Sequence, residues 1–373
     1  MIAAETQRPA TESPSNFCKG SESLKVLIVR TSALGDVAHT LPSLDALRSL
    51  FPEAKVHWIV EPLGAKLLEG HPSIDRIIVL PRQKWKRVFH NPLEWPAILG
   101  GIWRLSRSLR KERYDVVLDF HCNLRSAVIL LLAGGRRRVG FHPSDIAERG
   151  GALLTTIRAA KAPPRLNKVE KNLLLVRALG YRAPCPCGTL PISEADRDWA
   201  RALLARLPGS GPAVVIHPAV SKFGEIKRWP TGHFRELIDL LRSRHNAKTL
   251  ITWGPGERDI ATEVNRPTLL GEDVPLLRFA AILSQADLLI SADTGALPIA
   301  SLVGTPTVGL YGPKDAVVYS PYPVRGETLS SPAPCSPCKL RECEHRICMS
   351  LIRPDAVLKA AELALQGARV VPT

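Results

Sequence analysis

Short apolar runs alternate with helical segments along most of this chain, and this alternation constrains the fold more than any other feature. In the first half, runs rich in Val, Ile and Leu predict strands at residues 24–30, 55–60, 76–80 and 114–120. Segments with apolar residues at helical spacing lie between them, at residues 36–50 and 98–109. Strands separated by helices form parallel sheets with right-handed crossovers. The first half therefore predicts a doubly wound α/β domain.

The alternation stops at residues 184–191 (PCPCGTLP), whose Pro, Gly and Cys predict a linker, and then resumes. The second set of predicted strands comprises residues 213–217, 248–253, 287–291 and 305–310, and a helix that opens with a proline follows at 354–365. The sequence therefore predicts two Rossmann-like doubly wound domains facing a central cleft. The predicted parts are a disordered leader (1–23), an N-terminal domain (24–183), the linker (184–191), a C-terminal domain (192–350) and a closing helix and tail (351–373).

Composition favours a cytoplasmic protein with two hydrophobic cores. Hydrophobic residues make up 45% of the 373 residues, which excludes global disorder. No apolar run reaches the ~18–20 residues of a membrane span. Residues 1–23 are polar and lack the apolar core of a signal peptide. We expect a cytoplasmic location, with at most a peripheral contact between the protein and the inner membrane.

The net charge of +15 is concentrated in one segment of the chain. Residues 82–149 contain fourteen Lys and Arg against six Asp and Glu. Such a basic surface indicates an anionic partner, either nucleic acid, acidic lipid or a phosphorylated substrate, or else it is simply a solvated surface. The segment carries no known nucleic-acid-binding motif, so we expect no nucleic acid partner.

The loop after the first strand excludes two common classes of nucleotide-binding protein. It reads TSALGD, from Thr31 to Asp36, and contains one glycine. The chain therefore has neither the G-x-G-x-x-G of a dehydrogenase nor a Walker loop. In open α/β sheets, ligands bind at the carboxyl ends of the strands, so the strand-to-helix loops should carry the chemistry.

Asp36 ends this first loop, where a helix is expected to begin. Its carboxylate is therefore either the N-cap of that helix, which the spacing favours, or a general base at the mouth of the cleft.

Three loops of the second half suit a nucleotide diphosphate. Asp293, Thr294 and Gly295 follow a strand and precede a helix, whose free N–H groups can bind phosphate. Lys227 can neutralise a departing diphosphate without a metal, although it is also consistent with a solvated basic pair. Glu257, after another strand, can bind ribose hydroxyls. The chain has no D-x-D motif placed to hold a divalent ion on a nucleotide sugar.

A cysteine cluster follows these loops. It comprises Cys335, Cys338, Cys343 and Cys348. Four thiolates can bind zinc, but the spacing is tighter than that of a two-knuckle ribbon, and reduced or redox-variable thiols are the alternative. We expect no metal site and no cofactor.

The loops together resemble glycosyltransferase family 9. The stretches KVLIVRTSALGDVAHTLPSLDALR, HPAVSKFGEIKRWP, TWGPGE and SADTG…GTPTVGLYGP occur in the order and spacing of that family. The resemblance runs from about Leu24 to Met349 and is closest to the ADP-heptose:lipopolysaccharide heptosyltransferases of type I. It implies a GT-B fold and an inverting, metal-independent transfer from ADP-heptose to the inner core (Kdo/heptose region) of lipopolysaccharide. The implied partners are a nucleotide-sugar donor in the second domain and an anionic glycolipid acceptor in the first.

The resemblance also implies roles for individual residues. Asp36 matches the catalytic base and Lys227 the lysine that contacts the donor phosphates. Asp293, Thr294 and Gly295 match the nucleotide-sugar loop, and Glu257 matches the ribose-binding carboxylate. The implied acceptor-binding residues are Lys84, Lys86, Arg87 and Arg125.

At Pro298 the chain departs from the family pattern. Members usually carry a histidine there, in D-T-G-x-x-H, whereas this sequence reads DTGALP. Proline has neither a donor nor a charge, so the contact to the donor phosphate expected from the histidine is missing. Two alternatives follow from this departure. The chain is either a family 9-like glycosyltransferase that uses another nucleotide sugar, or a catalytically impaired protein that binds sugar nucleotides.

Overall fold

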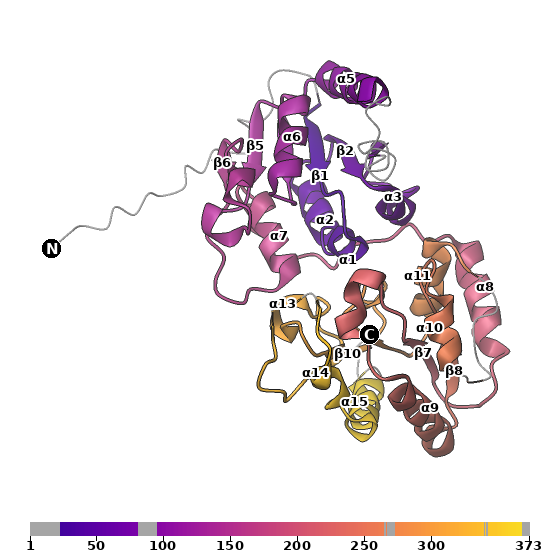
Figure 1. Cartoon of the computed structure of the whole chain (residues 1–373). Helices are drawn as coiled ribbons and strands as arrows, with labels where there is room; N and C mark the ends of the chain where they lie inside the picture. The colour runs from indigo at the N-terminus through magenta and orange to yellow at the C-terminus, as the bar shows by residue number, and fades with distance from the viewer. Residues whose placement is uncertain are drawn as a thin grey trace. The chain divides into compact units, whose positions relative to one another are not determined.

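The computed structural model describes residues 23–80, 95–264, 266, 273–338, 340 and 342–367. The chain divides into two compact units, residues 1–188 and 189–373 (Figure 1). Each unit contains one parallel sheet with helices, so the α/β fold class predicted from the sequence is confirmed. The leader and domain boundaries drawn from the sequence stay predictions.

The described part of the first unit forms a six-stranded sheet in the order β3-β2-β1-β4-β5-β6. Its strands are β1 (Lys25–Val29), β2 (Lys55–Val60), β3 (Arg76–Val79), β4 (Val116–Asp119), β5 (Arg137–Gly140) and β6 (Ile157–Arg158). All neighbours in this sheet pair in parallel. The order reverses at β1, whose next neighbour along the sheet is β4. Loops at such a reversal are the ones that bind ligands in doubly wound sheets.

The helices in the described part of the first unit pack on this sheet and bury its apolar residues. They are α1 (Leu34–Ala38), α2 (Leu41–Leu50), α3 (Pro62–Leu68), α5 (Trp95–Glu112), α6 (Leu124–Ala133) and α7 (Lys168–Arg177). One core cluster joins Leu27, Val29 and Ile59 from the sheet to Leu109 of α5 and Leu130 of α6. α6 is delimited at both ends by its own sequence: Asn123 and Ser126 form a capping box, and Gly134 ends the helix in a left-handed conformation.

The described part of the second unit forms a five-stranded parallel sheet in the order β11-β10-β9-β7-β8. Its strands are β7 (Ala213–His217), β8 (Lys248–Ile251), β9 (Leu288–Ala292), β10 (Thr307–Tyr311) and β11 (Gly326–Ser330). β7 and β9 pair with each other, and His217 lies opposite Ser291. The loops that follow these two strands therefore leave the sheet next to each other.

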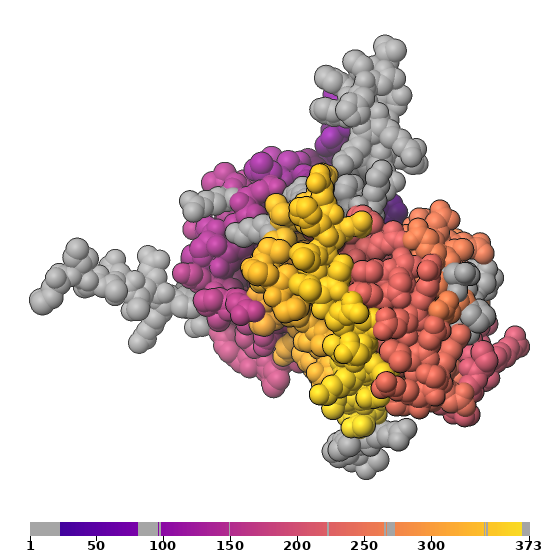
Figure 2. Space-filling view, turned by 60° about the horizontal axis from the view of Figure 1, so that its bottom comes forward, coloured from indigo at the N-terminus to yellow at the C-terminus, as the bar shows by residue number. Residues whose placement is uncertain are grey.

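The described helices of the second unit include one, late in the chain, that packs on the sheet. They are α8 (Glu194–Ala205), α9 (Thr231–His245), α10 (Arg258–Glu263), α11 (Leu276–Gln285), α12 (Ala296–Leu302), α13 (Ala316–Tyr319), α14 (Ile347–Ser350) and α15 (Pro354–Gly367). α15, in yellow, lies beside α9, in red, on one face of the unit (Figure 2). His245 and Glu362 join the two helices at 2.8 Å. The buried indole of Trp229 donates to the Ile352 carbonyl, which fixes the start of α15.

The main departures from the sequence prediction concern continuity and short strands. The helix predicted at residues 36–50 is wrong as one element, because α1 ends at Ala38 and α2 begins at Leu41. Pro42 is in the first turn of α2, where its missing N–H costs nothing, but it could not bond back to Ala38 in a continuous helix. Strands β5, β6 and β11 were not predicted. Among the described residues, no helix is long and apolar enough to cross a bilayer.

Candidate active site

In the first unit, polar residues gather at the carboxyl ends of β1 and β4. The two strands are neighbours, with Val29 opposite Asp119, so the loops that follow them start side by side. Arg30 is the first residue after β1 and is 4% exposed. Its guanidinium Nη1 donates to the carbonyl oxygen of Phe120, the first residue after β4. This bond connects the two loops and fixes the orientation of the Arg30 side chain.

Arg30 and Lys168 bracket the carboxylate of Asp36. Nη2 of Arg30 lies 2.5 Å from Oδ2 of Asp36, and Nζ of Lys168, the first residue of α7, lies 3.5 Å from Oδ1. The carboxylate and the ammonium are both partly buried, at 30% and 24% exposure. Each oxygen of the predicted base thus has its own cation.

These cations set the charge of Asp36. Burial alone would raise the pKa of this carboxyl, but the charges of Arg30 and Lys168 outweigh burial and hold the pKa well below its usual range. Asp36 is therefore ionised at any physiological pH. The N-cap interpretation of this residue is wrong, because the N-cap of α1 is Ala33 and Asp36 lies inside the helix. The assignment of Asp36 as catalytic base stays a prediction.

His39 lies next to this carboxylate, and sequence reasoning missed it. It is buried, and neither ring nitrogen has a hydrogen-bond partner among the residues that the structure describes. Burial lowers the pKa of His39 to about 4, so the ring is neutral at pH 7. The side-chain amide of Asn172 in α7 donates to the backbone oxygen of His39 at 3.0 Å. This bond holds α7, and with it Lys168, against the turn that carries Asp36.

The loop after β4 is shaped by a buried carboxylate. Asp119 accepts hydrogen bonds from the backbone N–H groups of His121 and Cys122 and from the hydroxyl of Ser126. Burial raises the pKa of Asp119 to about 6. Asp119 therefore holds the conformation of this loop through hydrogen bonds inside the unit.

Arg125 is the second residue of α6 and is exposed. Its charge, after burial and the charge of Arg30, contributes to lowering the pKa of His121 to about 4. Arg125 therefore lies close enough to influence the loop beside Asp36. The other predicted acceptor residues, Lys84, Lys86 and Arg87, lie outside the described residues.

In the second unit, Lys227 and Asp293 form an ion pair between neighbouring loops. Nζ of Lys227 lies 2.6 Å from Oδ2 of Asp293 and 3.2 Å from its backbone oxygen. The two side chains are 22% and 15% exposed. The structure therefore brings together two of the residues that the sequence predicts to bind the donor.

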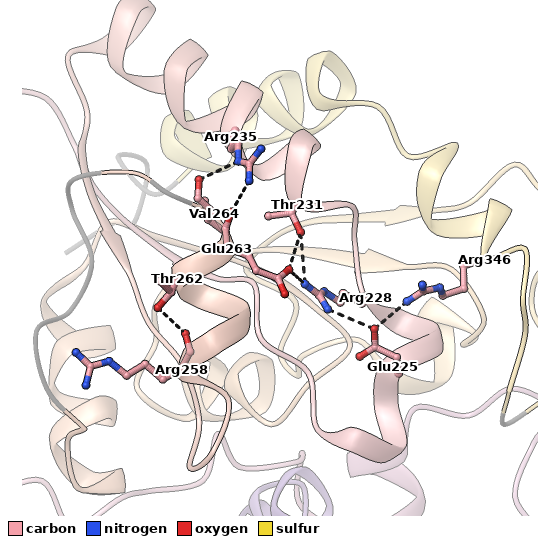
Figure 3. A network of polar contacts seen from close by, with 9 residues as sticks. All are labelled: Glu225, Arg228, Thr231, Arg235, Arg258, Thr262, Glu263, Val264 and Arg346. Atoms are coloured by element: carbon pink, nitrogen blue, oxygen red, sulfur yellow. Dashed lines mark hydrogen bonds and ion pairs between the residues drawn. The ribbon is translucent and has the colours of Figure 1, made fainter.

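A network of ion pairs fixes the segment that carries Lys227 (Figure 3). Arg228, the next residue, contacts Glu225 at 3.4 Å and also pairs with Glu263 of α10. Glu225 in turn accepts from Arg346 at 2.8 Å. These contacts attach both sides of the lysine to distant parts of the unit. Sequence reasoning missed this network because its members are up to 121 positions apart.

Thr294 and Gly295 form a tight turn between β9 and α12. Oγ1 of Thr294 lies 3.0 Å from the hydroxyl of Ser291 and accepts from the backbone N–H of Ala296 at 3.3 Å. Gly295 is the N-cap of α12, so Asp293, Thr294 and Gly295 precede the helix, as the sequence predicts. Pro298 is buried in the first turn of α12, where its missing N–H leaves no helix bond unmade.

Glu257 lies at the start of α10, and its carboxylate faces its own loop. Oε2 accepts from the backbone N–H of Gly254 at 3.2 Å. Burial raises the pKa of Glu257, against the effect of this hydrogen bond. Nearby, the guanidinium of Arg258 lies 5.5 Å from the ring centre of Trp253. The ribose-binding role of Glu257 stays a prediction.

The cysteine cluster belongs to the second unit. Burial raises the pKa of Cys348, and the neighbouring Cys335, Cys338 and Cys343 add to the rise. Within the described part of the chain, no group of three or more Cys, His, Asp or Glu is arranged to hold a metal ion. The expectation of no metal site stays a prediction.

The comparisons with known proteins agree on one family. The family description "Glycosyltransferase family 9 (heptosyltransferase)" matches residues 102–348. Lipopolysaccharide heptosyltransferase 1 of Pseudomonas aeruginosa is 29% identical over 332 residues, covering 87% of this chain and 88% of its own. The enzyme of the same name from Escherichia coli K12 is 29% identical and covers 78% of this chain and 89% of its own.

The solved structures agree with the sequence relatives. E. coli heptosyltransferase WaaC with ADP has a TM-score of 0.70 and 26% identity, covering 91% of this chain and 100% of that chain. WaaC has also been solved with ADP-2-deoxy-2-fluoro heptose, with the same TM-score and identity, covering 91% of this chain and 99% of that one.

Proposed function

Because the chain belongs to glycosyltransferase family 9 and is a glycosyltransferase, we propose that it is an inverting, metal-independent heptosyltransferase. The proposed donor is ADP-heptose, and the proposed acceptor is the inner core (Kdo/heptose region) of lipopolysaccharide. The solved complexes of WaaC with ADP and with a fluorinated ADP-heptose support the donor. The names of the curated relatives support the acceptor. A cytoplasmic location with peripheral contact to the inner membrane belongs to the same proposal.

The observation that carries the proposal is the ionised carboxylate of Asp36. In an inverting transfer, an acceptor hydroxyl attacks the anomeric carbon opposite the departing diphosphate and loses its proton as the new bond forms. The proposed base is Asp36, which the cations keep unprotonated and ready to accept this proton.

The same cations lower the basicity of Asp36, and we propose that binding of the acceptor raises it again. A carboxylate with a strongly lowered pKa has little affinity for a proton. Arg30 is buried and bonded to the Phe120 carbonyl, so it cannot leave. Lys168 is partly exposed and lies 3.5 Å away. In the proposed mechanism, an anionic group of the acceptor draws Lys168 from Asp36, which raises the pKa of the carboxyl when the substrate is bound.

On the donor side, the proposal assigns charge neutralisation to Lys227. The departing ADP carries the negative charge that develops as the glycosidic bond breaks, and a positioned ammonium stabilises it without a metal. In the free protein this ammonium is held by Asp293. Thr294 supplies a hydroxyl, Gly295 leaves room for phosphate beside the backbone, and Glu257 binds the ribose hydroxyls.

On the acceptor side, the proposal assigns the anionic groups of the glycolipid to Lys84, Lys86, Arg87 and Arg125. The exposed position of Arg125 near the Asp36 loop supports this assignment.

A second candidate function rests on Pro298. Its buried ring in α12 offers no donor or charge where the family pattern has a histidine. This observation favours a family 9 glycosyltransferase that uses another nucleotide sugar, or a homologue that binds donor but turns over poorly.

The test is a donor screen in the presence of EDTA. ADP-heptose and other nucleotide sugars would be offered with an acceptor that ends in the Kdo region, and product would be followed by mass spectrometry and by NMR of the new anomeric centre. We expect turnover with ADP-heptose alone and inverted stereochemistry. Dependence on a divalent ion, retention of configuration, or turnover with a different donor would each overturn a named part of the proposal.

A further inference from the structure

Helix α6 presents a row of large apolar side chains to solvent. Leu124, Val128 and Leu131 are 59%, 53% and 59% exposed and lie at the spacing of one helix face. The opposite face of the helix is buried in the core of the unit, including Ile129 and Leu130. α6 therefore has two apolar faces, of which the fold uses one.

Helix α5 carries a second exposed apolar row. Leu99 and Trp103, one turn apart, are 65% and 60% exposed. The guanidinium of Arg107, one turn further on, lies 5.3 Å from the ring centre of Trp103. The exposed row therefore consists of two apolar side chains followed by an arginine, whose guanidinium stacks on the indole of Trp103.

The two rows meet where the helices pack. Arg110 of α5 reaches the backbone oxygens of Leu131 and Leu132 at the end of α6, at 3.5 Å and 3.3 Å. Figure 1 shows both helices at the same end of the first unit. At the other end of α6, Gly150 lies against Leu124, and Leu153, which is 79% exposed, follows three residues later. We define the α5/α6 face as Leu99, Trp103, Leu124, Val128 and Leu131.

Positive charges surround this face. The basic residues of the two helices are Arg104, Arg107, Arg110, Lys111 and Arg125. Their acidic residue is Glu112, and it is paired with Arg76 at 3.0 Å and Lys25 at 4.0 Å. Glu148 lies at the start of α6, where its carboxylate accepts from the backbone N–H of Leu124 at 3.0 Å. Beside the α5/α6 face, five basic residues therefore stand against two acidic ones, and the net charge is positive.

We propose that the α5/α6 face docks on an anionic lipid surface. Leucines and a tryptophan flanked by arginines are the composition of helices that lie in the membrane interface, where the apolar side chains enter the acyl boundary and the cations bind headgroups. A second copy of this chain fits less well, because it would bring two sets of arginines together. The inference rests on the proposed function in one respect: a lipid-linked acceptor gives the docking its purpose.

The test measures sedimentation of the full chain with vesicles. One set contains phosphatidylglycerol and phosphatidylcholine in equal parts, and the other contains phosphatidylcholine alone. We expect binding to the first set that weakens as salt is raised. Leu99→Gln with Trp103→Gln, and separately Val128→Gln with Leu131→Gln, should each reduce binding by about tenfold or more. Arg104→Glu with Arg107→Glu should do the same.

Matched controls come from the second unit. Leu363→Gln changes a leucine of α15 that is 49% exposed, and Arg244→Glu changes an exposed arginine of α9. Both controls should bind vesicles as the unaltered protein does, and circular dichroism should show that all variants are folded. Equal vesicle binding by folded α5/α6 variants would overturn the proposal. A face that instead mediates self-association would show loss of a dimer in sedimentation velocity with vesicle binding unchanged.

The same variants separate this inference from the proposed function. Turnover on an acceptor analogue without acyl chains should stay normal in the α5/α6 variants. A chain that binds vesicles through this face but transfers no heptose would overturn the proposed function and leave the docking surface standing.

Discussion

The guanidinium of Arg30 lies 2.5 Å from the carboxylate of Asp36, and it is held there by a second bond to the Phe120 carbonyl. The side chain of Arg30 is 4% exposed, and both of its terminal nitrogens are bonded, so we expect it to stay in this position. Any change at Asp36 therefore acts on Arg30 as well as on the chemistry.

Asp36→Asn should abolish most of the turnover. The amide cannot accept the proton of the acceptor hydroxyl, and loss of a general base costs about 10²- to 10⁴-fold in kcat. Affinity for ADP, measured by calorimetry, should be unchanged. The variant also leaves the buried Arg30 without its counter-charge, so a drop in Tm is expected, and activity should be measured well below it. A folded variant with near-normal kcat would remove Asp36 from the catalytic role.

Lys168→Met should move the pH profile of the reaction. Removing one of the two cations raises the pKa of Asp36, because burial raises this pKa and only Arg30 would then remain of the two cations that lower it. In the unaltered protein Asp36 stays ionised well below its usual range, so the acid limb of kcat/KM should lie at lower pH than in the variant. The acceptor KM should also rise, because the proposed mechanism uses Lys168 to bind an acceptor anion. A variant with a normal Tm, acid limb and acceptor KM would contradict both roles.

Lys227→Ala should weaken donor binding. Loss of a charge-assisted contact to phosphate costs about 1.5–3 kcal/mol, or roughly 10- to 150-fold in Kd for ADP. Calorimetry in EDTA measures this directly. Lys248→Ala is the control, because Lys248 begins β8, at the opposite end of the strand from the loops. Equal effects of the two substitutions would indicate a general charge effect.

Charge reversal at the predicted acceptor residues should act on the acceptor alone. Lys86→Glu with Arg125→Glu should raise the KM for an acceptor without acyl chains and leave the donor KM nearly unchanged. The difference should shrink at high salt, because screening weakens exposed charge pairs. Arg244→Glu, which reverses the charge of an exposed arginine of α9, is the control for a charge reversal elsewhere on the protein. An unchanged acceptor KM would leave these residues as solvated surface.

Pro298→His tests the departure from the family pattern. If the position faces the donor phosphates, an added hydrogen bond worth about 0.5–1.5 kcal/mol should lower the Kd for ADP by roughly two- to tenfold. Pro298→Ala also removes the proline ring but adds no hydrogen-bond donor. It therefore separates the effect of the new donor from the effect of removing the proline. Tighter binding in both variants would assign the effect to the backbone of α12.

Much of the fold was predictable because the inner strands of each sheet are almost entirely apolar. β1 and β7 read KVLIV and AVVIH, and such short apolar runs are typical of buried parallel strands. β5 and β6 were not predictable in this way. Their sequences, RRVG and IR, are short and carry arginines. β5 forms a strand because β4 offers an edge, and β6 pairs in turn with β5.

The predicted base could be located because it follows the first strand, but its surroundings could not. Arg30 reads as an ordinary charged residue at the end of a strand, and nothing local shows that it is buried. Lys168 lies 132 positions from Asp36 in the chain, and only the packing of α7 on α2 brings them together. The lowered pKa of Asp36 is therefore a product of tertiary structure.

The position of α15 in the chain has a consequence for how the protein is made. The first unit has its strands complete by Arg158 and its helices by Arg177, so it can fold while the ribosome is still translating the second half. The second sheet must wait for α15, which packs on β9, β10 and β11 and follows all three strands in the chain. During that interval the apolar residues that α15 covers stay exposed to water.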